Sequence, residues 1–430
     1  MAVSLISSHP FGDAYAAKAG TLSTGSRIDV LRKAARTQIG RGLPGPKDEE
    51  WRFTPLNALS RVGFIPAAAA EDIDVTVVPS DVPRFERAIR VVLVNGVYRA
   101  DLSDKMAGID IRPLSESDAA LGSAAVTSLP LVALNTAFFP NGLAISAKGH
   151  QPQAVHIVSI GASGAEPVAF HPRVLITTAP GAELTVIESH IGLPGQPFFS
   201  NPVTEILVAE DACVRRYVAV TEDNDAFHIA TTGVTVAARG CFEAFHLGLG
   251  GSRSEGTVRQ EIHARVDGVG AQVHLNGAYA IGGGVHHDFT TVIDHVIGGA
   301  TSKQMFKGVL DGKSHGVYQG RVIVAKDAQK TDARQLHKAL FLVAGPSVDV
   351  KPELEIAADD VQCAHGATTG SLDPDHLFFL AARGLDPETA RMLLVEGFLA
   401  DALEQIGDAQ VREVFGRQVA GWLQRRGGAS

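Results

Sequence analysis

The feature that most constrains the fold is a turn that returns along the chain at an almost constant period. In the middle of the sequence a strand-like run ends at Gly or Asp followed by a small residue, and a second strand-like run then begins. The six turns are Gly181-Ala182, Asp211-Ala212, Gly240-Cys241, Gly270-Ala271, Gly299-Ala300 and Asp327-Ala328. Successive turns are separated by 30, 29, 30, 29 and 28 residues.

This period favours a β-solenoid. The runs before the turns are rich in Val, Ile and Thr, as strands are. One coil of a solenoid cannot bury its apolar side alone, so coils stack. Gly and Asp tolerate a left-handed backbone, and the small residue lets successive corners pack closely. An antiparallel meander explains the strands but not the constant turn chemistry. We therefore predict a mainly β fold, a parallel β-helix.

Helical regions are predicted on both sides of the solenoid. Apolar residues recur at three-and-four spacing in the first segment: Ile28, Leu31, Ala35 and Ile39. After residue 370 three amphipathic segments follow, two of them opened by capping residues such as Asp373 and Asp386. The predicted division is 1–75 for an N-terminal helical region, 76–370 for the β-helix and 371–430 for a C-terminal helical region. We expect the last of these to cap the open end of the solenoid.

Composition excludes several classes of protein. The net charge is −9 and neither sign forms a long run, so we expect no nucleic acid as partner. No stretch of about 18 apolar residues is present to span a membrane. Three cysteines cannot form a disulfide framework and favour a reducing compartment. Because the N-terminus also lacks the pattern of a signal peptide, we expect a cytoplasmic protein.

Two glycine-rich segments are tempting but weak candidates for nucleotide binding. "GVLDGKS" (308–314) has three residues between its glycines, whereas a phosphate-binding P-loop has four, and a strand-like run follows it. "AIGGGVHHD" (280–288) lacks the strand–turn–helix context of a dinucleotide fingerprint. We predict that this chain binds no nucleotide.

A histidine-rich strand offers ligands for first-row metals: His286, His287, Asp288, Asp294 and His295. Neighbouring residues on a strand face opposite sides, so His286 and His287 cannot easily enter one site, whereas His287 and His295 could share a face. We favour the interpretation that this segment is a polar exterior face of the solenoid.

Cys213 and Cys241 are 28 residues apart, almost one period. We therefore expect them to stack in adjacent coils and to pack in the core, where cysteine acts as a small hydrophobic residue.

Cys363 and His365 stand in the polar segment "ADDVQCAHGATTG" (358–370), where the predicted solenoid ends. Residues two apart on an extended segment point the same way, so both could face one surface. Thiolate and imidazole are good ligands for zinc or iron, but nothing nearby completes a site. A metal or cluster site, a structural turn and, less favoured, a Cys–His catalytic dyad remain open.

Several segments together resemble the SufB/SufD family, the paired scaffold subunits of the SUF iron–sulfur cluster assembly machinery. The segments are "GLPGPKDEEWRFTPL" (42–56), "HHDFTTVIDH" (286–295), "TSKQMFKGVLDGKSHGVYQGRVIVAKDAQKTDARQ" (301–335) and "LEIAADDVQCAHGATTGSLDPDHLFFLAARGL" (354–385). The Cys-x-His-Gly-Ala-Thr form of the last is similar to SufD. The chain departs from the family at His337-Lys338, where Asn is common, so we expect local interface packing to differ.

The resemblance implies a right-handed parallel β-helix between N- and C-terminal helical regions, and a scaffold subunit that is no enzyme by itself. It implies pairing with SufB through the β-helix and docking of the SufC ATPase on the C-terminal helices. It also implies a nascent iron–sulfur cluster at the SufB interface, near the histidine that matches His365. Cys363 matches the neighbouring cysteine.

Two alternatives come from other arrangements of the same fold. A β-helix carbohydrate-active enzyme of the polysaccharide lyase type would need clustered carboxylates and basic groups along one face and usually a secretion signal, and neither was evident in the sequence. A homodimer or a homomeric scaffold working without a second type of subunit is the other possibility.

Overall fold

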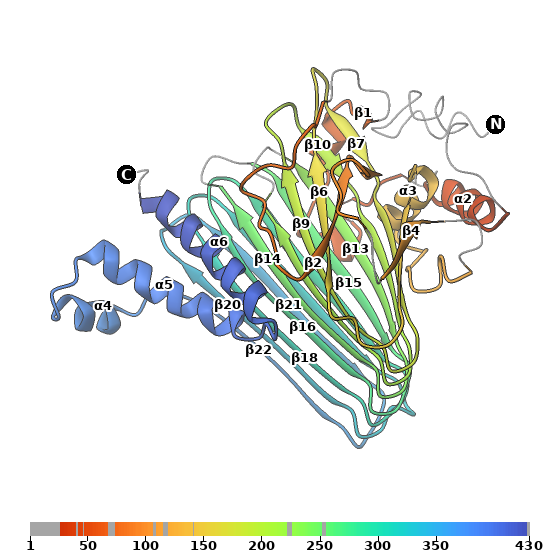
Figure 1. Ribbon diagram of the computed structural model, residues 1–430. Helices are drawn as coiled ribbons and strands as arrows, with labels where there is room; N and C mark the ends of the chain where they lie inside the picture. The colour runs from red at the N-terminus through yellow and green to blue at the C-terminus, as the bar shows by residue number, and fades with distance from the viewer. Residues whose placement is uncertain are drawn as a thin grey trace.

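The computed structural model confirms the parallel β-helix (Figure 1). The structure describes residues 26–39, 42–45, 47–67, 74–105, 109–114, 119–140, 142–221, 226–251 and 255–427. Residues 1–25, part of the predicted N-terminal helical region, lie outside the described residues. No helix within the described ranges is long and apolar enough to cross a membrane.

Two parallel sheets form the walls of the solenoid, and consecutive long strands alternate between them. The first sheet contains β4 (Asp110–Pro113), β5 (Gly142–Ala147), β8 (Arg173–Thr178), β11 (Val203–Val208), β13 (Phe227–Val236), β15 (Thr257–Val266), β17 (His286–His295), β19 (His315–Val324) and β21 (Ser347–Ile356), with short strands β1 (Ile65–Pro66), β7 (Val168–Phe170) and β10 (Phe198–Ser200). The second sheet contains β2 (Ala88–Val94), β3 (Val97–Tyr98), β6 (Ala154–Gly161), β9 (Glu183–Gly192), β12 (Cys213–Val220), β14 (Cys241–Gly250), β16 (Gln272–Ile281), β18 (Thr301–Leu310), β20 (Asp332–Phe341) and β22 (Gln362–Ser371).

The repeated turns form one corner of the coils, largely as predicted. Gly181, Asp211, Gly270 and Gly299 have positive φ angles of 68°, 59°, 73° and 71°. In the other two turns the left-handed residue is instead Arg239, with φ 54°, and Lys330, with φ 61°. Each corner amide donates to the next coil, as Gly270 N does to Gly299 O at 3.0 Å. Stacked corners therefore share hydrogen bonds as well as a backbone shape.

Alternate residues of each strand point between the sheets and form the core. In β16, Val273, Leu275, Tyr279 and Ile281 are fully buried there, and the other strands contribute in the same phase. Outward apolar residues of the second sheet, such as Tyr217, Phe245 and Leu247, form a separate cluster with the C-terminal helices. The second sheet is thus apolar on both faces where these helices cover it.

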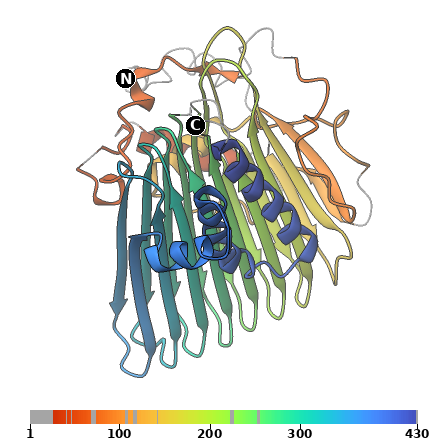
Figure 2. The same cartoon turned by 90° about the vertical axis from the view of Figure 1, so that its left-hand side faces the viewer.

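The C-terminal helices are α4 (Pro374–Ala381), α5 (Pro387–Leu403) and α6 (Ala409–Gly427). Asp373 and Asp386 cap α4 and α5 by accepting from backbone amides, as the sequence predicted. The expectation that the tail caps the solenoid end is wrong, because α5 and α6 lie across the outer face of the second sheet (Figure 2). The outward apolar residues of that sheet provide the surface on which the helices pack.

On the N-terminal side α2 (Ser26–Ile39) packs against α3 (Pro130–Phe138) beside the first sheet. In α2, Ile28, Ala35 and Ile39 are buried, which confirms the predicted apolar face. The 3₁₀ turns η2 (Glu49–Trp51) and η3 (Leu59–Arg61) follow. Trp51 is buried under the Arg259 guanidinium, 4.1 Å from its ring centre, so this segment is fixed to β15.

Candidate functional site

The C-terminal end of the solenoid is an open edge made by β21 and β22. Of the described strands, β21 is hydrogen-bonded only to β19, and β22 only to β20. Most residues of β22 are exposed, and none of β21 is fully buried. Unpaired edge strands present rows of free N–H and C=O groups that can pair with another chain. Both sheets therefore end in a surface suited to continuation by a second β-solenoid.

Cys363 and His365 lie on β22 at this open edge. Cys363 is in register with Ala333 and His365 with Gln335, and both of those β20 residues are buried. Cys363 and His365 therefore share the inward face of the last coil, and no further coil of the described residues covers them. Cys363 is half-buried and packs against the core, whereas His365 is exposed. Burial raises the pKa of the Cys363 thiol, so the thiol is neutral in the isolated chain.

The donor chemistry of this pair fits a metal or an iron–sulfur cluster, but two donors do not complete a site. Among the described residues no group of three or more His, Cys, Asp and Glu side chains could hold a metal ion. Any further ligands would have to come from outside the described residues, in this chain or in another molecule. Residues two apart on a strand are separated by about 6.6 Å, which does not favour a catalytic Cys–His dyad.

Gln335 provides a polar floor beneath His365. It is 3% exposed, and neither atom of its amide has a hydrogen-bond partner among the described residues. A buried amide without partners costs free energy that a hydrogen bond would recover. The amide and the exposed imidazole above it occupy adjacent positions on the same face of the last two coils. This arrangement makes the open end of the core polar.

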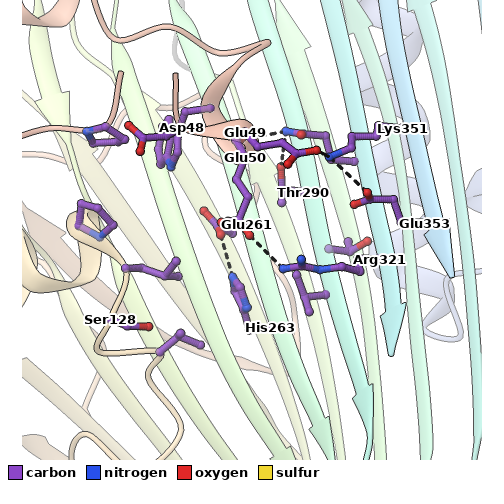
Figure 3. Close-up of a pocket in the computed structure, with 18 of the residues that line it drawn as sticks. Asp48, Glu49, Glu50, Ser128, Glu261, His263, Thr290, Arg321, Lys351 and Glu353 are labelled. Carbon is purple, nitrogen blue, oxygen red and sulfur yellow. Dashed lines mark hydrogen bonds and ion pairs between the residues drawn. The ribbon is translucent and has the colours of Figure 1, made fainter. Parts of the chain in front are cut away.

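A separate groove of about 720 Å³ lies on the outer face of the first sheet (Figure 3). Its floor is formed by β15, β17, β19 and β21, and its walls by residues 48–51 and 126–130. Arg321 contacts Glu50 at 2.9 Å, and Lys351 contacts Glu49 at 2.8 Å and Glu353 at 3.3 Å. These ion pairs attach the η2 turn to the sheet.

Glu261 is the most buried carboxylate of the groove. Burial alone would raise the pKa of Glu261, but the Arg259 charge and a 2.7 Å contact with His263 outweigh it and hold the pKa at about 2. The groove does gather carboxylates and basic groups from different coils, which the sequence analysis did not anticipate. Because Arg259, Arg321 and Lys351 are each already paired with carboxylates, the arrangement favours a structural joint over a site for an acidic polymer.

The histidine-rich strand is β17, and its interpretation as a polar exterior face is only partly correct. His287 and His295 do share a face, but that face is the solenoid interior, where both are buried. His287 stacks on Tyr279 with ring centres 5.6 Å apart, and His295 Nε2 lies 2.9 Å from Ser302 Oγ. Eight residues along a strand span about 26 Å, so the two rings cannot share a metal. Asp288 faces outward but is buried beneath Thr54.

Helix α4, in the region where the family resemblance implies docking of an ATPase, presents an apolar surface. None of its residues is buried, and Phe378 and Phe379 are 75% and 53% exposed. Leu393 on α5 is 45% exposed. We call these three residues the α4 patch. The hint in the sequence was the pair of adjacent aromatics, which cannot both face the core from one helix.

Comparison with known proteins gives one family. The family described as "SUF system FeS cluster assembly, SufBD core domain" matches residues 160–398. An iron–sulfur cluster assembly SufBD family protein of Synechocystis sp. is 29% identical over 418 residues, covering 91% of each chain. The iron–sulfur cluster assembly protein SufD of Escherichia coli is 28% identical over 402 residues, covering 92% of each chain. A SufBD family protein of Mycobacterium tuberculosis is 26% identical over 381 residues, covering 86% of this chain and 87% of the relative.

Proposed function

Because the chain belongs to the SufBD family of iron–sulfur cluster assembly proteins, we propose that it is a SufD-like, non-enzymatic scaffold subunit. It pairs with a SufB-like subunit through the open edge and docks a SufC-like ATPase on the α4 patch. Cys363 and His365 then contribute to a transient site for the nascent cluster, which is the cargo of the complex. The observation that carries this proposal is that both donors stand on the one strand, β22, that ends the second sheet.

Pairing through the open edge follows from the backbone. The Gln362 amide donates to Thr331 O in the preceding coil at 2.9 Å. In a parallel ladder the amides point to alternate sides, so those of Cys363, His365, Ala367 and Thr369 face away from β20. A SufB-like solenoid that accepts these bonds extends both sheets without a break. Its own side chains then lie opposite Cys363 and His365 and supply the missing ligands.

Replacing Thr369 by proline tests this pairing directly. Proline removes an amide that faces the free side and leaves the ladder to β20 intact, a position where edge strands tolerate it. We expect about 5- to 150-fold weaker binding to the SufB-like subunit, since an unpaired buried acceptor in the joint costs about 1–3 kcal/mol. Binding is measured by titration of one purified subunit with the other.

Thr369→Ala is the matched control, because it deletes the side chain and keeps the amide. It should bind as the wild type does. Equal affinity for the proline and alanine variants, with both folded, would place the joint elsewhere on the molecule and refute the proposed pairing.

The α4 patch gives a second prediction, on ATPase docking. Exposed aromatic pairs act as anchors in interfaces, and burying a charge there is costly. We expect Phe378→Asp or Phe379→Asp to weaken binding of the SufC-like ATPase about 30-fold or more, with the unfolding midpoint unchanged because α4 buries no residue.

Val269→Asp serves as the control for the α4 patch, since Val269 is a 62% exposed apolar residue at a corner of the solenoid. That variant should bind the ATPase normally. If it weakens binding as much as the α4 substitutions do, the effect is one of general charge and not of docking.

The tail also offers a route by which an ATPase could act on the open edge. Lys307 of β18 donates to Phe398 O at 3.0 Å, lies over the Phe398 ring and pairs with Asp401 of α5. In the second sheet β18 is followed by β20 and then β22. A displacement of α4 and α5 on ATP binding would thus move β18, which lies two strands from the strand that carries His365.

A further inference from the structure

Cys213 and Cys241 occupy neighbouring positions on the outer face of the second sheet. They are Cα partners in the parallel register of β12 and β14, which confirms the predicted stacking. The prediction that they pack in the core is wrong. The residues that follow them, Val214 and Phe242, are the buried ones, so alternation turns both thiols outward, where they are half-buried.

The surrounding positions make this pair unusual. One ladder of outward residues runs across the second sheet at the start of its strands, formed by Glu183, Cys213, Cys241, Gln272, Thr301, Asp332 and Gln362. Every other member of this ladder is polar. Packing therefore gives no reason for two successive cysteines here, and their contact with each other is what sets them apart.

We propose that Cys213 and Cys241 form a reversible dithiol–disulfide couple that exchanges with low-molecular-weight disulfides of the glutathione type. Adjacent strands bring the two Cα atoms to about 4.8 Å, within the 4.4–6.8 Å that a disulfide spans. Two turns of the solenoid corner, at Asp211 and Arg239, fix this approach, and no unfolding is needed to bring the sulfurs together.

The electrostatics of the pair assign a role to each thiol. The Cys241 thiol donates a hydrogen bond to Cys213, and this bond lowers the pKa of Cys213. The positive charge of Arg215 lowers that pKa further, whereas burial and the charge of Glu243 raise it. The same hydrogen bond raises the pKa of Cys241. Arg215 is held in place by Glu183 at 3.2 Å and Glu243 at 3.3 Å. Arg215 stands two residues from Cys213 on the same outward face of β12, and this position, together with the lowered pKa of Cys213, makes Cys213 the attacking thiolate and Cys241 the resolving thiol.

The exchange proceeds in two balanced steps. The Cys213 thiolate attacks one sulfur of the small disulfide, which forms a mixed disulfide and releases one small thiolate. The Cys241 sulfur, on losing its proton, attacks Cys213, closes the Cys213–Cys241 bond and releases the second small thiolate. The two protein protons end on the two released thiolates, and the small disulfide is reduced as the protein pair is oxidised.

The test counts thiols in the full-length chain after incubation with glutathione disulfide and alkylation under denaturing conditions. Because the chain has three cysteines, we expect two of three thiols to be lost, with Cys363 left free and no glutathione retained. Peptide mass spectrometry should show the 213–241 linkage, and dithiothreitol should restore three thiols. In Cys363→Ala no free thiol should remain after oxidation.

Two further variants separate the roles. Cys241→Ser should retain one glutathione on Cys213, and Cys213→Ser should react more slowly at Cys241. Three free thiols in the folded wild type, or loss of thiols only through dimers between chains, would overturn the couple. Equal reaction rates of the two serine variants would overturn the assignment of Cys213 as the attacking group.

Discussion

Replacing His365 by alanine is expected to remove most of the iron and acid-labile sulfide from a complex of this chain with its SufB-like and SufC-like partners, while the complex stays assembled. The side chain is exposed on the last strand, so its loss leaves no cavity in the core. Its removal takes away the imidazole of the Cys363–His365 donor pair on β22. Metal and sulfide analysis of the purified complex measures the outcome.

The geometry explains why this effect should be large. Cys363 is half-buried and its pKa is raised, so in the isolated chain the imidazole is the more accessible donor. Gln335 beneath it can orient a ring or a bound ligand through an amide that has no partner among the described residues. We therefore expect Cys363→Ala to lower the cluster content less than His365→Ala does.

His150→Ala is the matched control, because the His150 side chain is 72% exposed and lies at the far end of the solenoid, beside β9. It should retain full iron and sulfide. An intact complex of the His365 variant with wild-type content would mean that this chain supplies no ligand and acts only as a docking platform.

The repeating parts of the molecule could be predicted from the sequence because repetition averages out local ambiguity. Six turns at one period establish the coil, and four of them have the left-handed residue at the predicted position. At the other two the turn is shifted to Arg239 and Lys330, residues that no propensity would select. The solenoid tolerates them because the neighbouring corners already fix the chain direction.

What failed was the assignment of strand faces to inside or outside. Polarity suggested that His287 and His295 face solvent and that Cys213 and Cys241 face the core, and both assignments are reversed. The face on which a residue lies depends on which alternate positions of its strand point inward. This is evident only when the strand is compared with its neighbours in register. The role of Cys363 and His365 and the domain boundaries at 75 and 370 stay predictions.

Because histidines that the sequence suggested were exposed are buried, we expect a second large effect: the free energy of unfolding falls in mild acid. Burial lowers the pKa values of six histidines strongly: to about 3 for His156, His246 and His287, and to about 4 for His286, His295 and His337. Below pH 6.5 the unfolded chain binds these protons and the folded chain does not, so the free energy of unfolding falls as the pH falls. At pH 5 each histidine costs about 2 kcal/mol, or roughly 12 kcal/mol for the six together.

That sum is comparable with the whole stability of a typical domain, about 5–15 kcal/mol, so we expect the fold to be lost between about pH 6 and pH 5. Urea titrations at successive pH values, followed by the fluorescence of the buried Trp51 and Trp422, measure the trend. Buried carboxylates such as Glu261 cannot cause it. Their pKa in the unfolded chain is about 4.3, so the stability they contribute is lost only at lower pH.

The variant His287→Leu removes one of these titrating imidazoles, so that its contribution to the pH dependence of stability can be measured. Neither ring nitrogen of His287 has a hydrogen-bond partner among the described residues, so leucine removes the titration without breaking a bond. The variant should be about 2 kcal/mol more stable relative to wild type at pH 5 than at pH 7.5. A parallel pH dependence of His287→Leu and wild type would mean that the interior histidines are protonated in the folded chain, and that water reaches the core between the two sheets.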